Sequence, residues 1–144
     1  GNDADTFQIA NLDGSDTITD FTATGTSADK FAITGSGMNL TSGTVLGTGN
    51  VTSATALTNT AITTGSSFVN KLIKITSNTT TGSTATISTL NGNAYVLLFN
   101  GTNAQLYFDN NWTNTTERRL LATMSSITSL NGTLDLTNAN FCVI

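Results

Sequence analysis

Short apolar runs separated by Asn-Gly pairs are the feature that most limits the folds open to this chain. Such pairs occur at Asn91-Gly92, Asn100-Gly101 and Asn131-Gly132, and they favour tight turns because both residues tolerate a positive φ. The clearest unit has apolar runs at 93–99 and 104–108 on either side of the loop 100–103. This pattern predicts a β-hairpin, and its dense apolar residues predict that both of its faces are buried.

The rest of the chain is rich in Thr, whose branched Cβ favours strands over helices. Further strands are expected at Phe7–Ala10, Thr17–Phe21, Lys30–Thr34, Lys71–Thr76, Thr84–Leu90, Arg119–Met124, Thr133–Leu136 and around Cys142. Weaker helical patterns occur at Ser53–Asn59 and Glu117–Ser126, and residues 35–67 hold few large apolar side chains. Short strands with turn signals about every ten residues predict an all-β fold, either a β-sandwich or a β-roll.

The composition argues against several classes of function. The 144 residues include no His, no Pro, a single Cys and only five Lys or Arg against nine acids. The usual general base and the common zinc ligands are therefore missing, and the acidic balance is unsuited to nucleic acid. No apolar run approaches the roughly 18 residues of a membrane span. We expect a protein that is not an enzyme.

Acidic residues crowd the start of the chain. Six of the nine acids lie in the first thirty residues, where the only base is Lys30: Asp3, Asp5, Asp13, Asp16, Asp20 and Asp29. The stretch 31–108 then contains no acid. Carboxylates this close repel one another unless a cation lies between them. This acidic strip, defined as these six residues, is therefore a candidate metal site; turn and helix-cap roles for Asp beside Gly and Ser are the alternative.

Two phrases of the acidic strip share the order Asp-Thr-apolar-polar. One runs from Asp5 through Phe7 and the other from Asp16 through Ile18. They resemble the calcium-binding nonapeptide repeat of RTX β-rolls, although Asn11 and Leu12 stand at the paired-glycine positions. The resemblance implies calcium as cofactor, with Asp5 and Asp16 as ligands and Asp3, Asp13 and Asp20 as second candidates. It also implies that the regular repeats precede Gly1, and that Asp29 stabilises the turn into Lys30.

The segments 14–21 and 29–33 resemble the sequence that closes RTX arrays in type I secreted proteins, and the apolar end at 141–144 is similar to their secretion signal. The resemblance implies degenerate calcium-binding turns at residues 1–33 and a Thr/Asn-rich β domain at 34–144. It implies a non-catalytic structural or assembly domain of a bacterial cell-surface protein, such as an S-layer, filament or adhesin protein. Calcium would fold this domain outside the cell. Its partners would be copies of itself, other domains of its parent protein, or cell-surface polysaccharide.

The residues leave a second function open, an adhesin module that binds a glycan or an ice surface. Trp112, Tyr95 and Tyr107 would be its exposed contacts, whereas packing over the hairpin is the structural alternative. Other choices also stay open. Asp109 could begin a plain turn or a second calcium loop. The pair Arg118 and Arg119 could be solvated or could bind an anion.

Overall fold

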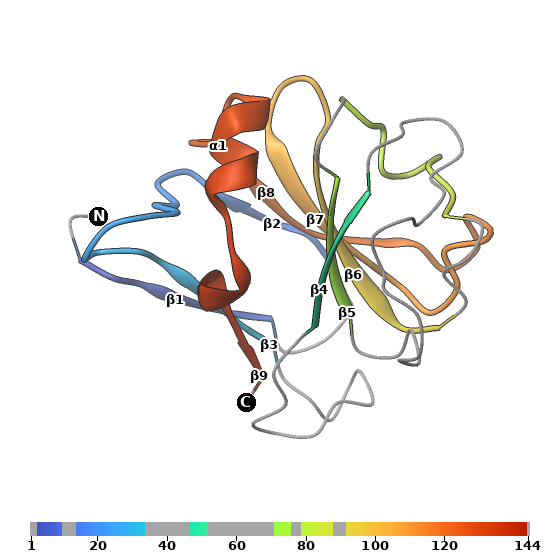
Figure 1. Cartoon of the computed structure of the whole chain (residues 1–144), viewed down its shortest axis with the longest axis horizontal. Helices are drawn as coiled ribbons and strands as arrows, with labels where there is room; N and C mark the ends of the chain where they lie inside the picture. The colour runs from blue at the N-terminus through green and yellow to red at the C-terminus, as the bar shows by residue number, and fades with distance from the viewer. Residues whose placement is uncertain are drawn as a thin grey trace.

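Two β-sheets make up the part of the chain that the computed structural model describes, which is residues 3–9, 14–33, 47–51, 71–75, 79–87 and 92–143 (Figure 1). The three-stranded sheet has the order β1-β3-β9, and the six-stranded sheet has the order β2-β8-β7-β6-β5-β4. The strands are β1 (Thr6–Ile9), β2 (Asp16–Ile18), β3 (Lys30–Ile33), β4 (Gly47–Val51), β5 (Lys71–Ile75), β6 (Ala94–Phe99), β7 (Ala104–Asp109), β8 (Arg119–Met124) and β9 (Phe141–Val143). One short helix, α1 (Leu130–Asp135), and a 3₁₀ turn at Asn138–Asn140 complete the elements. The expectation of an all-β protein is confirmed.

The chain begins by passing from one sheet to the other and back. β1 lies in the three-stranded sheet, β2 in the six-stranded sheet, and β3 returns beside β1 in parallel, with Thr6 opposite Lys30. β9 then pairs in parallel with the other side of β3, and β8 pairs in parallel with β2. The first strands are thus joined to the last ones. The division of the chain at residue 33 stays a prediction, since pairing shows only how the strands are connected.

The predicted hairpin is confirmed. β6 and β7 pair antiparallel from Ala94 opposite Asp109 to Phe99 opposite Ala104. The Asn100 side-chain oxygen accepts the N–H of both Thr102 and Asn103 at 2.8 Å, and Gly101 has a φ of 101°, which an L side chain rarely adopts. Every residue of β6 is buried, so the hairpin is covered on both faces, as its apolar density predicts.

A first core fills the space between the two sheets. Its aromatic centre stacks Phe31 between Phe21 and Phe141, with ring centroids 4.9 and 5.5 Å apart. Apolar side chains of the six-stranded sheet meet these rings from the other side: Ile18, Tyr95, Leu97, Leu106, Phe108, Leu121 and Met124. Burial of this much apolar surface is the main term that holds the sheets together.

A second core covers the opposite face of the six-stranded sheet, and Trp112 is its centre. The indole is fully buried, and its N–H donates to the Ala94 carbonyl at 3.0 Å. The Arg118 guanidinium lies 3.6 Å from the centre of the indole ring and forms an ion pair with Asp109 at 2.7 Å. It also donates to the carbonyls of Gly82, Ala85 and Asn114. Burial lowers the pKa of Arg118, while Asp109 acts in the opposite direction. The solvated role expected for Arg118 is therefore wrong, whereas Arg119 is exposed.

Two expectations about local structure are wrong, and a third, the strand at 84–90, extends beyond the described residues. Residues 133–136 include the end of α1 rather than a strand, because Ser129 caps the helix by accepting the N–H of Gly132. The helical pattern at 117–126 gives way to β8. Within the expected strand 84–90, the described residues 84–87 form a single bridge at Ile87. The expected helix at 53–59 lies outside the described residues.

The Arg118–Asp109 pair generates the first prediction. Arg118→Met should lower the free energy of unfolding by about 3–5 kcal/mol, because it leaves the Asp109 carboxylate buried without its cation. Arg119→Met, which changes the exposed neighbour, should cost less than about 0.5 kcal/mol. Urea unfolding followed by the fluorescence of Trp112, the only Trp, measures both. A loss for Arg118→Met no larger than that of the control contradicts the assignment.

Candidate functional site

The acidic strip is spread along the first two strands. Asp3 and Asp5 precede β1, Asp16 begins β2 and Asp20 follows it; all four are exposed. Asp13 lies outside the described residues. Nowhere in the described part of the chain do three acidic or Cys side chains gather closely enough to hold one metal ion. A calcium site takes six to eight oxygens, so these described residues do not by themselves form the expected carboxylate cage, and calcium binding stays a prediction.

Asp29 is an aspartate of the acidic strip with both carboxylate oxygens hydrogen-bonded to backbone N–H groups. It is only 2% exposed. One oxygen accepts the N–H of Asp5 and the other accepts the N–H of Thr22, each at 2.7 Å. The Asp29 N–H donates in turn to the Thr22 carbonyl, and the N–H of Lys30 donates to the Asp5 carbonyl. Asp29 thus joins the residue before β1 to the loop before β3, which is a wider role than the single turn expected of it.

Asn140 extends this hydrogen-bond network to the last strands. Its side-chain NH₂ group donates to the carbonyls of Ala23 and Asp29, both at 2.9 Å, and its oxygen accepts the N–H of Thr137. Asn140 is 3% exposed. Sequence reasoning missed it because nothing in the local pattern distinguishes it from the many other Asn residues of the chain. Asn140 and Asp29 together fix the start of the chain against its end.

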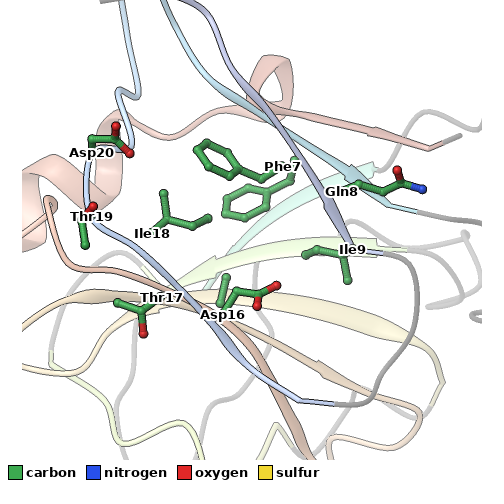
Figure 2. A pocket seen from close by; sticks show the side chains of 10 residues that line it. Phe7, Gln8, Ile9, Asp16, Thr17, Ile18, Thr19 and Asp20 are labelled. Atoms are coloured by element: carbon green, nitrogen blue, oxygen red, sulfur yellow. The ribbon is translucent and has the colours of Figure 1, made fainter. Parts of the chain in front are cut away.

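A cavity of about 310 Å³ opens between β1 and β2. Its lining is apolar at Phe7, Ile9, Ile18 and Phe31, and its polar residues are Gln8, Asp16, Thr17, Thr19 and Asp20, with Ala122 of β8 beside them. In Figure 2, Asp16 and Asp20 lie at the two ends of the β2 segment, while the ring of Phe7 and the side chain of Ile18 lie between the strands. This lining suits an apolar side chain, and the exposed carboxylate of Asp16 places a negative charge beside it.

The aromatic contacts expected of a glycan- or ice-binding module are buried. Trp112 and Tyr95 have no exposed surface, and Tyr107 is 6% exposed. Burial raises the pKa of Tyr95 above its usual range. All three residues therefore serve as core, and this alternative loses its aromatic anchors.

The turn after the hairpin is held by ordinary hydrogen bonds. One Asp109 oxygen accepts the N–H of Asn111 at 2.9 Å and the other is bound by Arg118. Asn110 donates to the Glu117 carboxylate at 2.7 Å. These contacts agree with the plain-turn interpretation of Asp109. At the chain's end, the Cys142 thiol is half-buried and lies 3.6 Å from the Phe31 carbonyl.

Asp29 generates the second prediction. Asp29→Ala should lower the free energy of unfolding by about 2–5 kcal/mol, because two N–H groups lose their acceptor. Asp29→Asn should cost less, since the amide keeps one acceptor oxygen. Asp3→Asn, which changes an exposed carboxylate of the same strip, is the control and should be nearly neutral. Urea unfolding with and without EDTA measures all three, and losses that appear only when calcium is present would contradict a direct structural role.

Comparison with known proteins adds no relative to this site. No protein-family model, curated protein sequence or solved structure matches the chain. In the described ranges, no helix has the length and apolar character needed to cross a membrane. The function is therefore argued from the geometry of the chain's own residues.

Proposed function

We propose that this chain is a non-catalytic structural domain of a secreted bacterial cell-surface protein, where it assembles with copies of itself or with other domains of its parent. The observation that carries the proposal is that the buried charged groups bind other groups of the same chain. Asp29 and Arg118 each bind backbone groups of separate segments, and Asp109 binds Arg118 and the N–H of Asn111. In this proposal the polar chemistry of the interior holds the fold together instead of acting on a substrate.

The low charge of the chain supports close packing between neighbours. Charged residues make up 10% of the sequence and the formal net charge is −4, compared with about 25% charged residues in typical domains. Self-repulsion between adjacent copies is correspondingly small. The passage of β1, β2 and β3 between the two sheets, with β1 and β3 parallel, supports a β-roll-like start to the domain.

Calcium is a separate part of the proposal and rests on the sequence. The four exposed aspartates Asp3, Asp5, Asp16 and Asp20 offer oxygen ligands near the first two strands. Extracellular calcium modules commonly bind with Kd values of about 10⁻⁴–10⁻³ M. An ion that binds only the folded chain would stabilise it by mass action.

Thermal unfolding with calcium or EGTA tests the calcium part. At calcium tenfold above the Kd, the stabilisation should be about 1.4 kcal/mol, which raises Tm by about 3–5 °C. Magnesium at the same concentration should give a smaller shift. Asp5→Asn combined with Asp16→Asn should remove the calcium effect, while Asp135→Asn, outside the acidic strip, should preserve it. An unchanged Tm removes calcium from the proposal.

Light scattering tests the assembly part. The chain should associate as its concentration rises, in the presence of calcium at millimolar levels, and the average mass should exceed that of one chain. Association that withstands added salt would agree with contacts made by low-charge surfaces. A strict monomer at high concentration with calcium contradicts the assembly role.

A further inference from the structure

β2 is an edge strand of the six-stranded sheet. Among the described strands it pairs only with β8, in parallel, with Asp16 opposite Ala122 and Ile18 opposite Met124. The Ile18 carbonyl accepts the N–H of Ser125 at 2.8 Å, on the β8 side. Successive residues of a strand direct their backbone groups to alternate sides, so the N–H and C=O of Thr17 face the outer edge. Asp16 and Thr17 are also exposed. An edge of this kind is a template for another strand.

The cavity lies beside this edge. Ile18 of β2 and Phe7 and Ile9 of β1 form part of its apolar lining, and Phe7 is only half-buried. β1 is likewise an edge strand, in the other sheet. Among the described strands, β1 and β2 are therefore the edges on either side of the cavity, and an apolar side chain placed in it would be removed from water.

The charge around β2 indicates which kind of strand could pair with its outer edge. The exposed carboxylate of Asp16 begins β2 and lines the cavity, and neither β1 nor β2 contains a base. A second copy meeting this edge with its own β2 would bring like charges together, which is unfavourable across paired strands. A basic strand would be attracted.

We propose that the outer edge of β2 binds an extended basic segment of another polypeptide by strand addition. Thr17 supplies the backbone donor and acceptor, the exposed carboxylate of Asp16 attracts Lys or Arg, and an apolar side chain of the segment enters the cavity. Backbone pairing then provides affinity, and the cavity with its acidic rim provides specificity. This inference rests on the proposed assembly function and specifies one partner chemistry for it.

Fluorescence anisotropy with two labelled peptides in EGTA buffer tests the inference. One peptide has the sequence Lys-Thr-Val-Thr-Leu-Thr-Lys, and the other has Glu in place of both Lys. The Lys peptide should bind saturably and at least tenfold more tightly than the Glu peptide, and added salt should weaken it. Equal binding of the two peptides, or no binding of the Lys peptide, overturns the proposal.

Two variants locate the binding at β2. Thr17→Pro removes the outer N–H and should weaken binding of the Lys peptide at least tenfold, whereas Thr17→Val keeps the N–H and should change it less than twofold. Asp16→Lys should make the chain bind the Glu peptide more tightly than the Lys peptide. If Thr17→Pro does not fold, this second variant tests the proposal. Unchanged binding in Asp16→Lys overturns the proposal.

Sedimentation of the chain alone separates this inference from the proposed function. If the chain self-associates but the Lys peptide does not bind, the proposed assembly function stands and the proposal of a basic partner strand is overturned. Self-association abolished by Thr17→Pro but not by Thr17→Val would identify a second copy as the occupant of β2, which also overturns it. The inference is supported when the Lys peptide binds and Thr17→Pro leaves self-association unchanged.

Discussion

The Asp29 carboxylate is the interaction on which the two ends of the structure depend. It accepts two backbone N–H groups, from Asp5 and Thr22, at 2.7 Å each, while Asn140 binds the carbonyl of the same residue. A buried carboxylate is costly unless hydrogen bonds replace its water. Here those bonds join the residue before β1, the loop before β3 and the turn before β9. The three-stranded sheet is thereby assembled from both ends of the chain.

Arg118 has the corresponding role on the far face of the six-stranded sheet. Its hydrogen bonds reach Asp109 at the end of β7, Gly82 and Ala85 in the segment 79–87, and Asn114 in the turn before β8. The guanidinium also lies over the indole ring of Trp112. A single cation therefore holds together the loops that contribute Ala85, Ile87 and Trp112 to the second core. A guanidinium suits this place because its planar set of donors can satisfy several acceptors at once. Lys74 has a smaller role of the same kind, because its ammonium group donates to the carbonyls of Leu134 and Leu136. Burial lowers the pKa of Lys74.

Local patterns in the sequence are enough to predict much of the sheet. The hairpin β6–β7, and the strands β1, β3, β5 and β8, follow from apolar runs and Asn-Gly turns, because those signals act within a few residues. β4 was missed because Gly47–Val51 has almost no large apolar residue and is a strand through its pairing with β5. The helix α1 depends on a cap at Ser129 that competes with the turn signal of Asn131-Gly132.

Pairing between distant segments leaves no local mark, so the roles of Asn140 and Arg118 could not be predicted. The acidic strip was recognisable as a cluster in sequence, yet the fold spreads its described members along two strands.

In the described part of the chain, the buried charged groups Asp29, Asp109 and Arg118 bind other groups of the protein, and β1 and β2 lie at the edges of the two sheets. Backbone amide hydrogen exchange in metal-free buffer tests this account most directly, because an amide bound to a buried carboxylate exchanges only when that contact opens. The account predicts that the N–H groups of Asp5 and Thr22 are protected as strongly as those of the central strand β7. Exchange of these two amides at the rate of an exposed loop residue such as Gly25, while β7 stays protected, would contradict it.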